Sequence, residues 1–194
     1  MKKLILIDAY AMIYRAYYAF IKSPRINSKG INTSAIFGFV NTLVDVINKE
    51  NPDYLGVAFD PKGGSFRAQL DENYKAQREK TPEDISIAVP IIKDILKAFN
   101  IPIFEVVGYE ADDVIGTLAL QASLHDDLET FMMTLDKDYG QLVRDNVRML
   151  RPKHVGTGFD KLGPKEICEK HGIDTPLQVI DLLGLMGDAS DNVP

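Results

Sequence analysis

Four short apolar segments of the sequence, residues 2–7, 54–59, 103–107 and 129–134, each lead into acidic residues. Stretches with apolar residues at helical spacing lie between them. This alternation predicts an α/β fold with a central, mostly parallel sheet flanked by helices. Ligands of such sheets bind at the carboxyl ends of the strands. The fold is therefore expected to gather on one edge the acids that follow these segments, namely Asp8, Asp60, Glu110, Asp112, Asp113, Asp136 and Asp138.

Helices are expected where apolar residues recur every three or four positions or where capping residues and Pro begin a segment. The pattern predicts a fifth strand at 147–150 and a loop or hairpin at 153–163. Asp136 and Asp138 would point the same way if the preceding strand persisted through them. The predicted helices span residues 11–20, 33–49, 82–99, 110–122, 164–171 and 176–186.

The composition fits one globular domain of 194 residues with 45% hydrophobic residues. No apolar run approaches the roughly 18 residues of a membrane span. The single cysteine, Cys168, cannot form an internal disulfide and indicates a reducing compartment. The net charge of −6 is unevenly spread, because residues 1–30 are basic and residues 100–140 strongly acidic. A polyanionic partner and an acid-rich pocket are thus compatible on one molecule.

The stretch GYEADDVIG, residues 108–116, places three acids at the start of a helix. An acidic first turn is ordinary helix capping, because the positive end of the helix dipole favours anions. Glu110 and Asp113 would share a face there, whereas Asp112 points elsewhere. Three acids exceed the needs of a cap, so a ligand site is the alternative interpretation.

Clustered carboxylates need a counter-charge, since two of them about 5 Å apart repel by roughly 3 kcal/mol at an effective dielectric near 20. Ligands that are all oxygen favour Mg²⁺, Mn²⁺ or Ca²⁺ over Zn²⁺. His125, His154 and His171 are scattered and receive no metal role. The number of acids points to two or more ions, and paired ions support phosphodiester hydrolysis.

Residues 66–80 combine basic and aromatic side chains in a segment of low apolar content. A solvated helix face is one interpretation. The other is a mobile basic arm that grips phosphates, with Lys75 and Arg78 on one helix face.

The runs GYEADDVIGTLA, TLDKDYGQLV, FRAQLDENYKAQR and LLGLMGDASDNVP resemble the 5′-nuclease domain of bacterial DNA polymerase I, in the flap-endonuclease family. The resemblance covers essentially the whole chain. It implies a PIN-like core, a basic helical arch at about 62–81 and two divalent ions, Mg²⁺ or Mn²⁺. It also implies a monomer that removes 5′ flaps and RNA primers from branched DNA in the bacterial cytoplasm near the nucleoid, linked covalently to polymerase domains.

The resemblance also assigns roles to individual residues. Lys75 and Arg78 would contact the scissile phosphate, Arg67 and Tyr74 would bind substrate, and Asp112 would be essential for cleavage. Ala9 and Leu135 stand where the family usually has glycine, which removes access to positive φ near Asp136. The first metal would be held by Asp8, Asp60, Glu110, Asp112 and Asp113, and the second by Asp136, Asp138, Asp188 and Asp191.

Family members continue into a helix–hairpin–helix element that grips duplex DNA, which this chain lacks after Pro194. We therefore expect weaker DNA affinity for this fragment. Two alternatives remain open. One is a module that binds metal and DNA without turnover, and the other is a PIN-type ribonuclease.

Overall fold

The computed structural model describes residues 1–153, 157–188 and 191–193. Its described strands form one sheet in the order β3-β2-β1-β4-β5-β6, in which all neighbours are parallel except β5 and β6. The predicted fold class is confirmed, and so is a hairpin at the end of the sheet. The strands are β1 (Lys2–Asp8), β2 (Tyr54–Ala58), β3 (Ile103–Phe104), β4 (Leu128–Met133), β5 (Val147–Pro152) and β6 (Phe159–Leu162).

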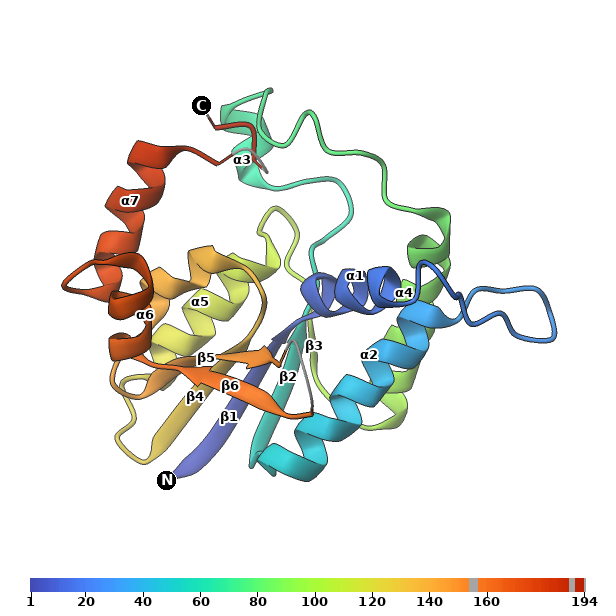
Figure 1. Cartoon of the computed structure of the whole chain (residues 1–194), viewed down its shortest axis with the longest axis horizontal. Helices are drawn as coiled ribbons and strands as arrows, with labels where there is room; N and C mark the ends of the chain where they lie inside the picture. The colour runs from blue at the N-terminus through green and yellow to red at the C-terminus, as the bar shows by residue number, and fades with distance from the viewer. Residues whose placement is uncertain (154–156, 189–190, 194) are drawn as a thin grey trace.

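Helices cover both faces of the sheet (Figure 1). One face packs on α1 (Ala9–Ala19), α2 (Ser34–Asp45) and α4 (Glu83–Ala98), and α2 continues into a π-helical turn at Val46–Glu50. The short helix α3 (Phe66–Leu70) stands apart, above the carboxyl ends of the strands. The other face packs on α5 (Ala111–Ala122), η2 (Lys137–Leu142), α6 (Pro164–His171) and α7 (Val179–Met186), and η3 (Pro176–Gln178) lies against η2.

The central strand β1 is buried on both faces because its side chains alternate between two cores. Ile5 and Ile7 enter the core beneath α1, α2 and α4, whereas Leu6 enters the core beneath α5. Burial on both sides explains why the segment is a continuous apolar run rather than an alternating one.

The order of strands reverses at β1. The chain moves outward from β1 to β2 and β3, then crosses through α5 to β4 on the other side of β1. Adjacent carboxyl ends at such a reversal are where α/β sheets form ligand sites. Asp8 at the end of β1 and the residues after Met133 occupy this position.

Strand β3 is shorter than the sequence pattern indicates, and β4 ends one residue earlier than expected. β3 keeps only Ile103 and Phe104, because the chain then leaves the sheet and exposes 86% of Val107. β4 ends at Met133, and Asp136 caps the 3-10 helix η2. The condition under which Asp136 and Asp138 would point the same way, a strand that persists through both, is therefore not met.

In the part of the chain that the structure describes, no helix has the length and apolar character required to cross a membrane.

Candidate active site

Asp8 joins the central strand to the first helix without an intervening loop. Its Oδ1 accepts a hydrogen bond from the backbone amide of Ala11 at 3.1 Å, which caps α1. Its Oδ2 accepts one from the Thr134 hydroxyl at 3.0 Å. Burial raises the pKa of Asp8 to about 6, although these hydrogen bonds oppose the shift. A carboxylate is thus held in an enclosed position without a cationic partner among the described residues.

A second group of acids surrounds the amino end of α5. Oδ1 of Asp60 accepts from the amide of Ala111 at 2.7 Å, and Oδ2 of Asp113 accepts from the amide of Glu110 at 2.9 Å. The helix start thus explains part of this acidity, as capping predicts. Asp112 is different, because burial and the charge of Asp113 raise its pKa to about 6.

A third group of acids begins at η2. Asp136 accepts from the amide of Asp138 at 3.0 Å, and Asp188 pairs with Lys137 at 3.2 Å. Burial, followed by the charges of Asp136 and Asp188, raises the pKa of Asp138 to about 6. Oδ1 of Asp138 is buried and accepts no hydrogen bond from any described residue. A buried oxygen without a partner in the protein is suited to bind a ligand that is not part of the chain.

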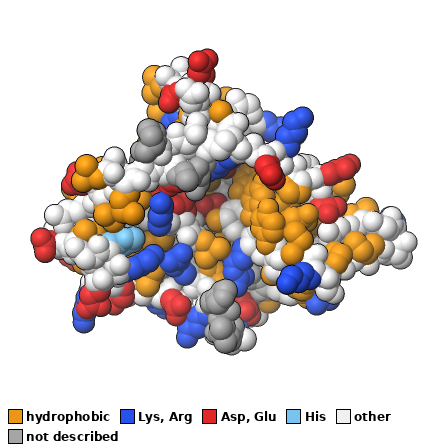
Figure 2. All heavy atoms as spheres, turned by 45° about the horizontal axis from the view of Figure 1, so that its top comes forward, with side chains coloured by type: hydrophobic (Ala, Val, Ile, Leu, Met, Phe, Trp, Pro, Cys, Tyr) orange, Lys and Arg blue, Asp and Glu red, His pale blue; other side chains and the backbone are white. Residues whose placement is uncertain are grey.

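Strand-end acids from the three groups meet at one cavity of about 490 Å³. Lys75 and Arg78 line the same cavity, together with Tyr10 and Tyr14 of α1. Figure 2 shows acidic and basic side chains side by side around the hollow on this face. Glu79 lines the cavity too, and the expected site acids that line it are Asp8, Asp60, Glu110, Asp112 and Asp136.

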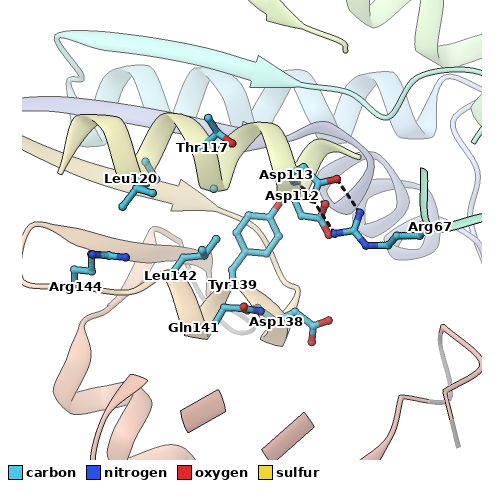
Figure 3. Close-up of a pocket in the computed structure, with 12 residues that line it drawn as sticks. Arg67, Asp112, Asp113, Thr117, Leu120, Asp138, Tyr139, Gln141, Leu142 and Arg144 are labelled. Atoms are coloured by element: carbon cyan, nitrogen blue, oxygen red, sulfur yellow. Dashed lines mark hydrogen bonds and ion pairs between the residues drawn. The ribbon is translucent and has the colours of Figure 1, made fainter. Parts of the chain in front are cut away.

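Basic side chains of residues 66–78 pair directly with three acids of the site, Glu110, Asp113 and Asp191. Arg67 donates two hydrogen bonds to Asp113, at 2.8 and 2.7 Å (Figure 3). Lys75 donates to Oε2 of Glu110 at 2.8 Å, and Arg78 donates to Asp191 at 2.7 Å. Burial raises the pKa of Glu110 and of Asp113, but the hydrogen bonds from Lys75 and Arg67 outweigh it and leave both values lowered.

The segment 66–78 is less helical than expected. Helix α3 ends at Leu70, and the chain then turns, with Lys75 in the left-handed region at φ 55°. The prediction that Lys75 and Arg78 share a helix face is therefore wrong. Lys75 instead donates to Glu110 and lies 3.9 Å from the carboxylate of Asp191, to which Arg78 donates.

The acids suit a hard divalent cation by their chemistry, because every donor is a carboxylate oxygen. The unpartnered Oδ1 of Asp138 supports this fit. Among the described residues, no three acidic, His or Cys side chains lie close enough together to hold a metal ion as they stand. Glu110, Asp113 and Asp191 point toward the cations of the segment 66–78 instead.

Three positioning residues escaped the sequence analysis. Ser65 donates to Oε1 of Glu110 at 2.8 Å, and Thr134 links Asp8 to the amide of Asp136. Tyr139 is 1% exposed and places its hydroxyl 3.5 Å from Oδ2 of Asp8. The hydroxyl residue that precedes LDKD was the available signal for Thr134. His154 lies outside the described residues.

Comparison with known proteins identifies relatives along the whole chain. A DNA polymerase I of Bacillus caldotenax is 40% identical over 194 residues, which cover 100% of this chain and 22% of that protein. A 5′-3′ exonuclease of Aquifex aeolicus is 40% identical over 195 residues, covering 100% of this chain and 64% of that protein. The chain thus spans about a fifth of the length of the polymerase relatives.

The fold is shared with a solved T5 5′-exonuclease that carries bound zinc. The TM-score is 0.73 at 21% identity, and the match covers 100% of this chain and 69% of that one. A family model described as the 5′-3′ exonuclease, N-terminal resolvase-like domain matches residues 3–172. Because that match takes in most of the sequence, the chain belongs to the family of 5′-3′ exonuclease N-terminal domains.

Proposed function

We propose that this chain is a divalent-metal-dependent, structure-selective 5′ nuclease that hydrolyses phosphodiester bonds of 5′ flaps and primers in replication and repair. The observation that carries the proposal is the cavity in which five strand-end acids face Lys75 and Arg78. Acids alone suit a cation, whereas acids beside basic side chains suit a metal ion together with a phosphate. The family membership supports the same activity.

The acids would hold two ions, Mg²⁺ or Mn²⁺, in two neighbouring groups. Asp8, Asp60, Glu110, Asp112 and Asp113 would serve the first, and Asp136, Asp138, Asp188 and Asp191 the second. Ions bound there would lower the pKa of a coordinated water and stabilise the leaving oxygen. The site of the T5 relative, which is described with bound zinc, is consistent with a divalent centre on this fold.

The chain's own residues would position the reacting groups. Thr134 fixes the carboxylate of Asp8 by donating to Oδ2, and Ser65 fixes Glu110 by donating to Oε1. Lys75 and Arg78 would contact the scissile phosphate and offset its developing charge. The ring of Tyr74 would stack on a terminal base, while Arg67 would bind the strand beyond it.

In the polymerase relatives, this nuclease would be one part of a longer chain. We propose branched or RNA-primed DNA as substrate, and covalently attached polymerase domains as the partner. The bacterial relatives point to the bacterial cytoplasm as the compartment.

The decisive experiment measures cleavage of a labelled 5′-flap DNA with Mg²⁺, with Mn²⁺ and with EDTA. We expect cleavage with either metal, none with EDTA, and a loss of at least about 100-fold in Asp112→Asn. Asp94→Asn is the matched control, because Asp94 lies on the exposed side of α4 in a pair with Lys97.

The alternatives give different results in the same assay. Cleavage that persists in EDTA would contradict the metal-dependent proposal. Metal-dependent binding of the flap without product would identify a binding module. Preferential cleavage of single-stranded RNA would identify a ribonuclease.

A further inference from the structure

The segment 66–78 is held above the acids almost entirely by polar contacts. Helix α3 contains no buried residue, and Leu70 is 81% exposed. Little apolar burial therefore fixes this segment, so its position depends on hydrogen bonds and ion pairs.

These contacts connect the segment to two separate elements. At the amino end of α5, Arg67 forms an ion pair with Asp113, and Lys75 forms one with Glu110. At the turn that contains Asp191, Arg78 forms an ion pair with the Asp191 carboxylate. The amide of Lys75 donates to the backbone oxygen of Asp191 at 3.2 Å.

Two neighbouring side chains complete the attachment. The Tyr74 hydroxyl lies 3.0 Å from Oε2 of Glu110 and 3.2 Å from Oδ2 of Asp191, so it bridges both elements. The side-chain amide of Asn192 donates to the backbone oxygen of Asn73 at 3.1 Å. Lys75 has a positive φ, and its ammonium group lies 2.8 Å from Glu110 and 3.9 Å from the carboxylate of Asp191.

The charges of the attachment balance. Three cations, Arg67, Lys75 and Arg78, face three carboxylates, those of Glu110, Asp113 and Asp191. Divalent ions bound at these acids would add positive charge at the same place and repel the three side chains. Among the described residues, the ion pairs of the segment do not include Asp8, Asp112 or Asp138, which stay available to a metal.

We propose that the segment 66–78 is a metal-operated latch. Without divalent ions its basic side chains neutralise Glu110, Asp113 and Asp191 and keep the segment closed over the cavity. When a metal ion binds to these carboxylates, they no longer pair with the basic side chains, and the segment is released. Lys75 and Arg78 can then contact the phosphates of a nucleic acid. The inference rests on the metal site of the proposed function and adds a competition between metal and side chains to it.

Hydrogen exchange followed by mass spectrometry tests the release directly in the absence of DNA. We expect amides of residues 66–80 to exchange at least about fivefold faster with saturating Mg²⁺ than with EDTA. Amides in the interior of α5, near the buried Ile115 and Ala119, serve as the internal control and should not change.

Calorimetry on the same samples separates the two proposals. Mg²⁺ binding without faster exchange of residues 66–80 would overturn the latch and leave the metal site standing. If neither Mg²⁺ nor Mn²⁺ bound, the proposed metal site would fail, and the latch with it.

The substitution Lys75→Met gives a second, independent readout. If the ammonium group competes with metal for Glu110, its removal should lower the Kd for Mg²⁺ by about 3- to 10-fold. The ion then no longer has to break the ion pair between Lys75 and Glu110. Lys97→Met, in an exposed pair on α4, should leave the Kd unchanged. An unchanged or higher Kd in Lys75→Met would overturn the competition.

Discussion

The guanidinium of Arg67 forms a bidentate ion pair with the carboxylate of Asp113, and both hydrogen bonds are 2.8 Å or shorter. The hydrogen bond from Arg67 and the charges of Asp112 and Asp113 raise the pKa of this arginine, against the effect of burial. A side chain expected to bind substrate therefore holds an acid of the site in the metal-free protein. Its geometry matters, because lysine cannot form the same paired contact.

Arg67→Lys should lower the melting temperature of the metal-free protein by about 2–5 °C, since one of the two hydrogen bonds to Asp113 is lost. Thermal unfolding followed by circular dichroism in EDTA measures the change. Lys97→Met, which removes an exposed ion pair, should shift the melting temperature by less than about 1 °C. Equal shifts in the two variants would show that the pair with Asp113 adds no stability.

Asp8→Asn should stabilise the metal-free protein near neutral pH. Burial raises the pKa of Asp8 to about 6, so the ionised carboxylate destabilises the folded state above that pH. Below about pH 4 the carboxyl is protonated in both states, and its cost disappears. The melting temperature of the variant should therefore exceed that of the wild type by on the order of 5 °C at about pH 8.

The difference between the two proteins is the diagnostic quantity, because other groups titrate in both. His171, whose pKa burial lowers, shifts stability in the opposite sense, but it is present in both proteins and cancels. The gap should stay near its full size above about pH 7 and shrink as the pH falls from about 6 to about 4. A gap that does not change with pH would contradict the raised pKa of Asp8.

Thr134→Val should destabilise the protein by about 1–2 kcal/mol, because it leaves Asp8 one hydrogen bond short and the amide of Asp136 without its acceptor. Urea unfolding gives the free-energy change. Thr134→Ser keeps the hydroxyl and should recover most of the loss. If serine failed to do so, the methyl group of Thr134 rather than its hydroxyl would account for the effect.

Tyr74 offers a way to separate its hydroxyl from its ring. Tyr74→Phe removes the contacts to Glu110 and Asp191 but keeps a stacking surface, so flap cleavage should stay within about threefold of the wild type. Tyr74→Leu removes the ring and should slow cleavage by about 5- to 100-fold if a base stacks there. Single-turnover rates on a flap substrate measure both effects. Equal rates for phenylalanine and leucine would argue against stacking.

Much of the fold follows from local patterns in the sequence. The apolar run before Asp8 and the helical spacing after Thr33 predict β1 and α2, because burial of these side chains fixes their local structure. The pattern was misleading at residues 105–107, where Val106 and Val107 are exposed although they resemble a strand. Strand length there depends on pairing with β2, which is a long-range contact that local periodicity does not encode.

The sequence predicted which acids gather at the site, but not which side chains pair with one another there. Acids at strand ends predicted the cavity shared by Asp8, Asp60 and Asp136, because the sheet sets their position. The pairing of Lys75 with Glu110 was not predictable, since it depends on a left-handed turn far from α5 in the sequence. Ion pairs between distant segments leave no periodic signal.

The place of β1 in the sheet has a consequence for folding during synthesis. This strand is made first, yet it pairs with β2 on one side and with β4, which ends at Met133, on the other. Chains emerge from the ribosome with the amino end first. A nascent chain therefore cannot join Asp8 to Thr134 until β4 has emerged and docked. Assembly of the acidic centre is thereby delayed until two thirds of this sequence has been translated. Before that point, the growing chain has no assembled centre that could react with a nearby nucleic acid.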